Sequence, residues 1–508
     1  MSNECSELLI IHYSLFIFVS CLSAYPNQNS HTQSNRAFLI LNFLIKFFLM
    51  STLKHSQDEK FFLLNWLKGS LIGNLVGLLS PWRSSSYLLG YSDVITAIFV
   101  CLVIISSPFT SNTLVGIILL AGGGFWVLLT VSDIDKNQIT PIHLCIFAYW
   151  LISVAATAFS PLKMAALSGL VKFTLYLLLF ALASRVFAKT KMRSLIMGTY
   201  LLVSLIVSAY GVRQQFIGVK PLATWTDPTS PLADTTRVYS FLGNPNLLAG
   251  YLIPAVAFSV VALIVWKTKP QKILAGFALV INVACVYFTG SRGGWLALIG
   301  TGIVFLLGFK FWWNEYLSPF WRKWCIPIVI ASFLLLVGVA MIFVEPLRIR
   351  IFSLFSWRGD SSNNFRINVW ISALQMLQDY PLIGIGPGNE VFNQIYPLYM
   401  QTKFTALSAY SIFLEIALET GLIGLFSFLA VIVTTFKRGM VLIKKMKPSN
   451  DLQAIWILGA IASLAGLATQ GLFDTVWYRP QINTLWWLCV AIVAAVYSLK
   501  SETDNHVS

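Results

Sequence analysis

Charged residues are scarce in this chain. Asp, Glu, Lys and Arg make up 11% of the 508 residues, whereas apolar residues make up 57%. The mean hydropathy is +0.75. Such values exclude a soluble globular protein and indicate a polytopic membrane protein. The net charge of +15 would suggest nucleic-acid binding in a soluble protein. In a membrane protein it reflects basic cytoplasmic loops, so no nucleic-acid partner is expected.

The residue patterns of several chemistries are also missing. The sequence contains neither a GxxxxGK[ST] phosphate loop nor an HExxH helix, so it offers no support for ATP-driven or zinc chemistry. Its seven cysteines are scattered without a CxxC pair, which excludes a disulfide framework and a cysteine metal site. No internal repeat supports an inverted-repeat transporter. We therefore expect no metal and no cofactor.

Long apolar runs recur along the chain and predict an all-α polytopic fold of about twelve transmembrane helices within residues 94–499. The run at 94–107 is the least well defined, because Ser106, Ser107 and Pro108 end it early. The runs lie at 94–107, 113–131, 142–158, 164–184, 195–210, 247–266, 272–289, 293–309, 325–344, 408–435, 453–473 and 484–499. Two long insertions separate them, 211–246 and 345–407, the second between the ninth and tenth runs.

The distribution of lysine predicts the orientation. Alternate connections carry basic residues, at 185–193, 267–272, 310–323 and 437–447, and the intervening short connections carry almost no lysine. The positive-inside rule then places both termini and the tail 500–508 in the cytoplasm of a plasma-membrane protein, with both long insertions outside.

Residues 1–93 are expected to be a cytoplasmic or otherwise undetermined N-terminal extension. Its apolar runs at 8–23 and 38–50 are both short of the ~20 residues that a spanning helix needs. Glu4 and Glu7 replace the positive start of a signal peptide. Since residues 50–69 resemble an ordinary cytoplasmic start, we hypothesise that translation begins at Met50.

The outer segments are rich in arginine, in contrast to the lysine of the inner loops. The planar guanidinium fork suits bidentate contact with carboxylate, carbonate or phosphate, so these arginines predict binding of an anion. The alternative is surface pairing with the outer carboxylates at 227, 234, 345, 360 and 379. The arginines are Arg213, Arg237, Arg292, Arg348, Arg350, Arg358, Arg366 and Arg479.

Arg292 belongs to the segment TGSRGG at 289–294, between two apolar runs. An arginine at the membrane edge is costly unless it is paired or faces a polar cavity, which makes it a functional candidate. The alternative is an arginine that merely extends to the lipid headgroups.

The segment 363–424 is the longest without a membrane-length apolar run. Apolar residues at 367, 370, 371, 374 and 377 predict an amphipathic helix that Pro381 ends, and the glycines at 384, 386 and 388 predict a tight turn rather than a phosphate loop. Glu415 and Glu419 follow on one helix face. They could pair with arginine, act as acid and base, bind a cation, or form a structural ion pair. The five histidines lie at 12, 31, 55, 143 and 506, so no histidine base is expected in the outer insertions.

Three ordered motifs carry a family resemblance over residues 288–424: TGSRGGWLAL, RINVWISALQMLQDYPLIGIGPGNEVF, and LEIALETGLIGLF, which extends to residue 426. With them, the chain resembles the O-antigen ligase and polymerase superfamily over a ligase-like region at 272–435. Through YSFLGNPNLLAGYL at 239–252 and LSAYSIFLEIALETG at 407–421 it is most similar to the cyanobacterial inorganic-carbon (bicarbonate) transporter family.

The resemblance implies a helical inner-membrane fold. Ligases of the superfamily take a glycan from a polyprenyl diphosphate carrier outside the cytoplasm, using outer arginines and a loop histidine. Arg292 matches the arginine of the SRG motif, and Arg366 begins the matching loop helix. Ala409 and Tyr410 stand where the ligases have His-Asn, so it stays open whether the chain is an enzyme.

Two functions therefore stay open. In the first, outer arginines recognise bicarbonate for inorganic-carbon uptake. In the second, they hold the diphosphate of a polyprenyl-linked glycan, and Tyr410, Glu415 or Glu419 does the work of the histidine. The lipid bilayer is a partner in both. The anion-binding candidates are Arg213, Arg292, Arg366 and Arg479.

Overall fold

The computed structural model describes residues 77–132, 139–219, 236–356 and 358–503, and the described residues form helices and no strands. Those before the second long insertion are α5 (Ser80–Ser85), α6 (Tyr87–Gly90), α7 (Ser92–Ser106), α8 (Asn112–Ser132), α9 (Pro141–Phe159), α10 (Lys163–Val186), α11 (Thr190–Ile217), η1 (Ser240–Leu242), α12 (Pro245–Val265), α13 (Lys269–Phe288), α14 (Arg292–Trp313), η2 (Asn314–Tyr316) and α15 (Pro319–Phe343). The remainder are α16 (Glu345–Phe355), α17 (Ser361–Asp379), α18 (Asn389–Ile395), η3 (Tyr396–Leu398), α19 (Ile412–Met446), α20 (Ala454–Gly471) and α21 (Pro480–Thr503).

The predicted all-α membrane fold is confirmed. Within the described residues, 11 helices are long and apolar enough to cross a membrane. The twelfth predicted run, 94–107, forms α7, which has 15 residues and is shorter than a usual span. The protein is thus a multi-pass integral membrane protein.

Three helices, α12, α20 and α21, form the centre of the bundle. Their membrane-length windows are 78%, 83% and 89% buried, because they are apolar on all sides and packed by neighbours all round. Helix α20 packs on α12, α14 and α19. The centre therefore fixes the ends of α12, α14 and α19, from which the outer segments extend.

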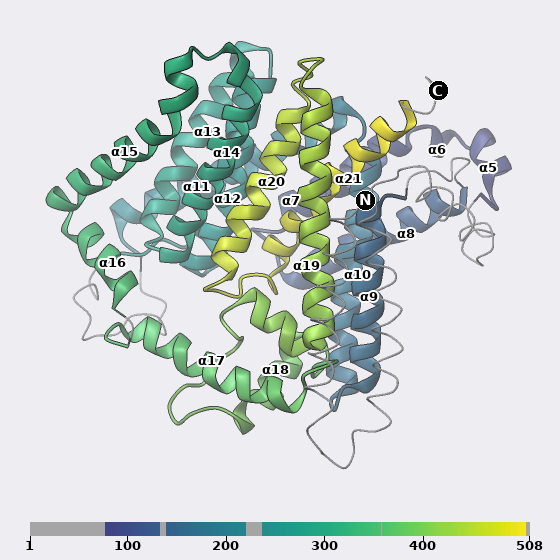
Figure 1. The fold of residues 1–508 in the computed structure, drawn as a ribbon. Coiled ribbons are helices and arrows are strands. Elements are labelled where there is room, and N and C mark those ends of the chain that lie inside the picture. Colours follow the sequence, from purple (N-terminus) through teal and green to yellow (C-terminus); the bar gives the residue numbers. More distant parts are fainter. Residues whose placement is uncertain (1–76, 133–138, 220–235, 357, 504–508) are drawn as a thin grey trace, which may run out of the picture. The chain divides into compact units, whose positions relative to one another are not determined.

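Helix α15 differs from every other span. None of its membrane-length window is buried, although its mean hydropathy of 2.8 is the highest of the 11 spans. It packs mainly against α16, and Figure 1 shows it standing apart from α14. Its side chains are apolar because they face lipid rather than protein.

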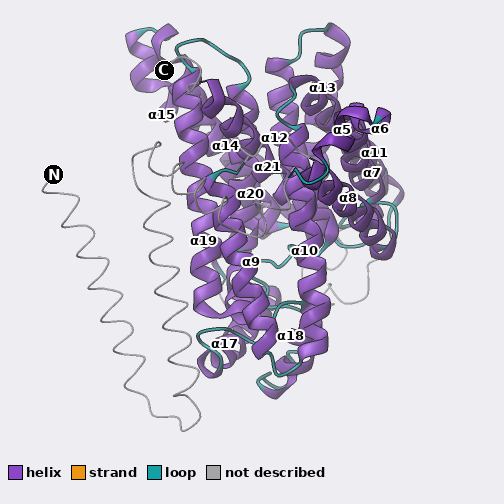
Figure 2. Ribbon diagram, turned by 90° about the vertical axis from the view of Figure 1, so that its right-hand side faces the viewer, coloured by secondary structure: helices purple, strands orange, loops and turns teal. Residues whose placement is uncertain are grey.

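The insertion 345–407 is largely helical. It forms α16, α17, α18 and η3, and both Figure 1 and Figure 2 place α17 and α18 beyond the end of the bundle where α19 begins. Helix α17 ends at Asp379, before Pro381, as predicted. Its buried face consists of Asn368, Val369, Ser372, Ala373 and Met376. The larger apolar residues of the predicted stripe are only partly buried, and Leu374 is exposed, because small residues allow the closest approach to neighbouring segments.

Helix α19 is broken at Gly421, where φ is 67°. The glycine-rich segment 381–388 packs on this break. Ile385 N–H donates to the Leu418 carbonyl (2.8 Å), and Leu422 N–H donates to the Pro381 carbonyl (2.8 Å). A Cβ at Gly421 would lie 2.0 Å from the Leu382 carbonyl oxygen. The predicted glycine turn is therefore a close packing site for a helix, and the segment supplies hydrogen bonds that the break removes.

Some predicted boundaries change. Helix α11 continues to Ile217, so the first outer insertion begins later than residue 211. Of the N-terminal extension, residues 77–93 form α5, α6 and the start of α7. Met50, the segment 220–235 and both chain ends lie outside the described residues, so the proposed start and the location of the termini stay predictions.

Candidate anion-binding site

Four arginines from four separate segments act on one another at the end of the bundle that carries α17. They are Arg237 before η1, Arg292 at the start of α14, Arg350 on α16 and Arg366 on α17. Loss of hydration, with the positive charges of the other three as smaller causes, lowers the pKa of Arg237 to about 9. A cluster of like charges with perturbed pKa values is a candidate site for binding an anion.

Arg292 connects three helices. Its guanidinium donates to the Ser353 carbonyl (3.2 Å) and hydroxyl (2.9 Å) on α16, and to Asp360 Oδ1 (2.8 Å) before α17. Asp360 also accepts the N–H of Asn363 (2.9 Å) and so caps α17. Because both side chains are mostly buried, with 12% and 23% exposed, this pair is held more firmly than a surface salt bridge.

Arg237 and Arg366 are also held by directed hydrogen bonds. Arg237 donates to the Thr289 carbonyl (3.0 Å) and to Asn246 Oδ1 (3.2 Å). Arg366 donates to the Phe473 carbonyl (2.8 Å) and to the Ser362 hydroxyl (2.7 Å). The Arg237 contacts join the segment before η1 to the end of α13 and the start of α12, and the Arg366 contact with Phe473 joins α17 to the residues that follow α20.

Arg350 lies against the backbone of the SRG turn. A Cβ at Gly290 would lie 3.2 Å from the Arg350 guanidinium carbon, so the guanidinium packs closely on this turn. The φ of +58° at Gly290 itself favours glycine. Burial, together with the charge of Arg292, lowers the pKa of Arg350 to about 10. Within the described residues no hydrogen bond or ion pair of the Arg350 side chain is formed. Its guanidinium is thus the one best placed to take a ligand.

Asp474 and Tyr410 complete the site. Asp474 is buried next to Arg366 and Arg237, and burial raises its pKa despite their opposing charges. Burial also raises the pKa of Tyr410, and the charge of Asp474 acts in the same direction. The Tyr410 ring meets Phe365 edge-on at 5.4 Å, and its φ of 50° is rare for a residue other than glycine. Such strain is typical of functional sites.

The charge balance defines the kind of ligand. The cluster contains Arg237, Arg292, Arg350 and Arg366, and the two carboxylates that face it are Asp360 and Asp474. Four positive and two negative charges leave a surplus of two positive charges in a partly buried place. A ligand with two negative charges would balance it.

Glu415 and Glu419 do not join the arginines. Glu415 is buried, with 3% exposed, and accepts the N–H of Ala409 (2.6 Å). Glu419 accepts the N–H of Gly388 (2.8 Å). Neither forms an ion pair with any described residue, so the expected pairing with arginine is not observed. The two carboxylates instead fasten the loop segments around 388 and 409 to α19, and Glu415 thereby fixes the backbone next to Tyr410.

Arg213 and Arg479 are not brought to the cluster either. Both are exposed, and each lies over a neighbouring tyrosine, at 5.9 Å from the Tyr210 ring and 5.1 Å from the Tyr478 ring. Neither is among the charges that act on Arg237 or Arg366. Of the four predicted anion-binding arginines, the structure brings together Arg292 and Arg366.

Sequence reasoning did not single out Arg237, Arg350 or Asp474. The first two were part of the outer arginine set, but spacing gave no means of choosing them. Asp474 carried a weak signal, a carboxylate directly after the apolar run 453–473. Such a residue at the outer membrane edge is a functional candidate for the same reason as Arg292.

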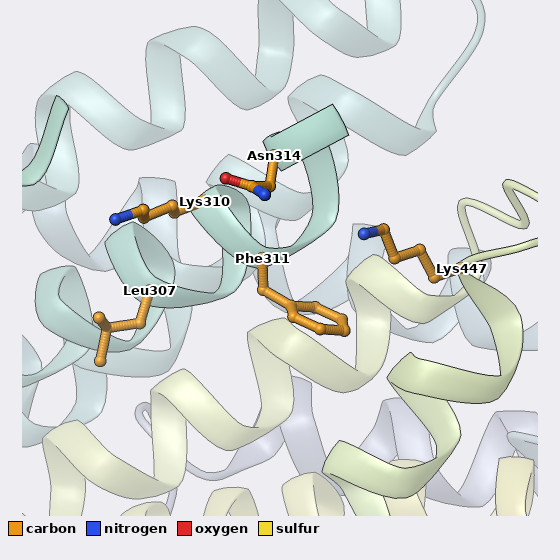
Figure 3. Close-up of a pocket in the computed structure, with 5 residues that line it drawn as sticks. All are labelled: Leu307, Lys310, Phe311, Asn314 and Lys447. Atoms are coloured by element: carbon orange, nitrogen blue, oxygen red, sulfur yellow. The ribbon is translucent and has the colours of Figure 1, made fainter. Parts of the chain in front are cut away.

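The opposite end of α14 holds a second feature. A surface depression of about 340 Å³ is lined by Leu307, Lys310, Phe311, Asn314 and Lys447. Figure 3 shows Phe311 and Asn314 between the two lysines. The α14 residues that line the depression are 15 or more positions along the helix from Arg292, so the depression is separate from the arginine site. Among the described residues, no group of three or more His, Cys, Asp or Glu could hold a metal ion.

One comparison with known proteins covers part of the same region. Residues 277–429 match the family model described as O-antigen ligase. The match includes Arg292, Arg350, Asp360, Arg366 and Tyr410, and it leaves out Arg237 and Asp474. No curated protein matches the chain. The arginine site thus lies largely within an O-antigen ligase-type domain of a multi-pass membrane protein.

Proposed function

We propose that the arginine cluster binds the diphosphate of a lipid-linked glycan and that the protein transfers this glycan, as an O-antigen ligase-type enzyme. The charge surplus of the cluster supports this best, because a diphosphate diester carries two negative charges. Arginine forks suit phosphate oxygens, and three of the four come from residues 277–429. In the membrane, α14 and α15 would leave the lipid part of such a substrate within the bilayer.

The proposed reaction needs a base and a stabilised leaving group. The acceptor hydroxyl oxygen bonds to the anomeric carbon, the bond from that carbon to the diphosphate oxygen breaks, and the polyprenyl diphosphate leaves with the electron pair. Its added negative charge is stabilised by the four guanidinium groups. The acceptor's proton passes to Asp474, the buried carboxylate beside Tyr410, while the Tyr410 hydroxyl donates a hydrogen bond at the site.

The orientation follows from the same charges. The lysine-rich end of the bundle faces the cytoplasm and the arginine site faces outward from the plasma membrane, as the positive-inside rule requires. A glycan carried by a lipid would be present on that outer side.

Measuring substrate binding and turnover separately distinguishes the proposed role of Arg292 from that of Asp474. Nanodiscs holding the protein are supplied with a radiolabelled polyprenyl diphosphate-linked oligosaccharide, and both its binding and the release of polyprenyl diphosphate are measured. We expect Arg292→Ala to lose binding, and Asp474→Asn to keep binding but lose most turnover. Arg213→Gln serves as the matched control. Lack of binding by the wild type would exclude the proposal.

Bicarbonate transport is the second candidate, supported by the absence of an imidazole at the site. The one described histidine, His143, lies at the start of α9 near Thr140 and Ser184, at the other end of the bundle. A carrier needs no base, and arginine also suits a planar anion. Flux of labelled bicarbonate into proteoliposomes tests this: flux that Arg292→Ala abolishes, without lipid-glycan binding, would replace the first proposal.

A further inference from the structure

The lysine-bearing depression at the far end of α14 has the features of a binding site, and the proposed glycan chemistry does not use it. Lys310, Asn314 and Lys447 supply polar groups, and Leu307 and Phe311 supply apolar walls. Its volume of about 340 Å³ is at the lower end of the range for small-ligand pockets. Because the depression has both polar and apolar lining residues, it is expected to bind a ligand that is charged at one end and apolar at the other.

An apolar stripe leads along α14 into the depression. Ile299, Ile303, Leu307 and Phe311 follow one another at intervals of four residues, and all are exposed, by 38–54%. Residues four apart lie on one face of a helix. Twelve residues rise by about 18 Å, close to the roughly 15 Å of one leaflet's hydrocarbon. The stripe therefore matches the length of a lipid acyl chain.

The charge around the depression is strongly positive. Lys447 directly follows α19, and Arg322 and Lys323 lie near the start of α15, where Arg322 donates to the Asn314 carbonyl. Glu315 is the acidic residue of the connection between α14 and α15. Lys447 contacts Glu315 (2.7 Å) and lies 4.9 Å from the centre of the Phe311 ring. Glu315 is 74% exposed, and an ion pair with so exposed a partner contributes little stability. A phosphate can therefore replace this carboxylate.

We propose that this depression and stripe bind one anionic phospholipid from the leaflet at the lysine-rich end of the bundle. The phosphate lies between Lys447 and Lys310, the Asn314 side chain donates to it, and one acyl chain follows Ile299 to Phe311. The Lys310 ammonium points away from Lys447 in Figure 3, and its flexible stem allows it to turn toward the phosphate. Basic recesses between membrane helices bind anionic headgroups in this way.

The test compares two double variants with the same loss of charge. Lys310→Gln with Lys447→Gln removes the proposed ligands, and Lys437→Gln with Lys444→Gln removes two exposed lysines of α19 that do not line the depression. Delipidated full-length protein in detergent is titrated with phosphatidylglycerol or with phosphatidylcholine of identical acyl chains. Native mass spectrometry counts the bound lipids, and thermal unfolding before titration verifies that each variant is folded.

We expect the wild type to retain one phosphatidylglycerol in preference to phosphatidylcholine. The site variant should bind it about tenfold more weakly, and the control variant should lose less than twofold. Equal losses in both variants would mean diffuse surface attraction and overturn the proposal. Equal retention of the two lipids would also overturn it, as would full displacement of the lipid by millimolar inorganic phosphate. If the Gln variant is unfolded, Lys310→Ala alone, against Lys437→Ala, gives the same comparison.

Discussion

Helix α14 carries positive charge at both ends, in two chemical forms. At its start, Arg292 forms three hydrogen bonds to two other segments and is mostly buried. At its end, Lys310 and Lys447 border a shallow depression, and the partner of Lys447 is an exposed carboxylate. Directed hydrogen bonds fix the basic side chain at the first end, whereas the lysine side chains at the second end are charged but little constrained.

The two ends of α14 differ in their basic residue, and this difference corresponds to what the residue does at each end. A planar guanidinium can hold two protein segments and still recognise phosphate oxygens, but only when its neighbours fix it. A lysine on a flexible stem supplies charge for membrane topology and for headgroups that arrive in many orientations. The same formal charge therefore predicts different sensitivity to substitution at the two ends.

Replacing the basic side chain by alanine gives the strongest test of the difference between the two ends of α14. Arg292→Ala should weaken binding of a dialkyl diphosphate about 100-fold, because it removes a buried charge and leaves Asp360 unpaired. Lys310→Ala should change this affinity less than twofold. Calorimetric titration of the detergent-purified proteins measures both, and equal losses would show that the ends do not differ.

Exchanging arginine for lysine at the first end of α14, and lysine for arginine at the second, tests the same difference more finely. Arg292→Lys keeps the charge but loses the fork that reaches Ser353 and Asp360 together, so affinity should fall about tenfold. Lys310→Arg should leave it unchanged. If Arg292→Lys binds as well as the wild type, charge alone accounts for the site.

The pH dependence tests whether the arginines act as a cluster. The Arg237 pKa is lowered to about 9, so its guanidinium is charged below that pH and loses its charge as the pH rises through it. Affinity for a dialkyl diphosphate, which does not titrate there, should fall about fivefold between pH 7.5 and 9.5, for a loss of roughly 1 kcal/mol. The Arg237→Gln variant should show a shallower profile over this range, because only the beginning of the Arg350 titration, with a pKa of about 10, remains within it. A profile with the same slope in both proteins would contradict the assignment.

The smallest effects are expected for the exposed outer arginines. Arg213→Gln and Arg479→Gln should each change diphosphate affinity less than twofold, because these side chains lie over tyrosines outside the cluster. The same titration measures them at 0.15 M salt, where long-range attraction is screened. A tenfold loss in either variant would extend the site beyond the four arginines.

The membrane fold was predictable because span length and hydropathy are local properties. All 12 predicted runs are helices, and 11 of them are long enough to cross a membrane. The start of α17 was less predictable, since its cap, Asp360, lies outside the apolar stripe. Its buried face was also offset from the stripe, because small residues such as Ala373, rather than the largest apolar ones, meet the neighbouring segments.

The candidate site was predictable only in part because its contacts join distant positions. Arg292 was found from its place at a membrane edge, but its partner Ser353 is 61 residues away. Arg237 reaches Thr289 across 52 residues. No spacing in the sequence encodes such pairs. The contacts of the two glutamates could not be predicted either, since their helical spacing gave no information about the loop N–H groups of Gly388 and Ala409 that donate to them.

The break at Gly421 has a consequence for folding. Ile385 N–H donates to the Leu418 carbonyl, and Leu422 N–H donates to the Pro381 carbonyl. Because of these bonds across the break, neither the glycine-rich segment nor this turn of α19 can satisfy its backbone alone. Helices α17 and α18 and the first part of α19, from Ile412 to Gly421, should then open and close as one cooperative unit in hydrogen exchange. A deletion within 381–388 would thus destabilise a membrane helix, and the loop is inseparable from the span that follows it.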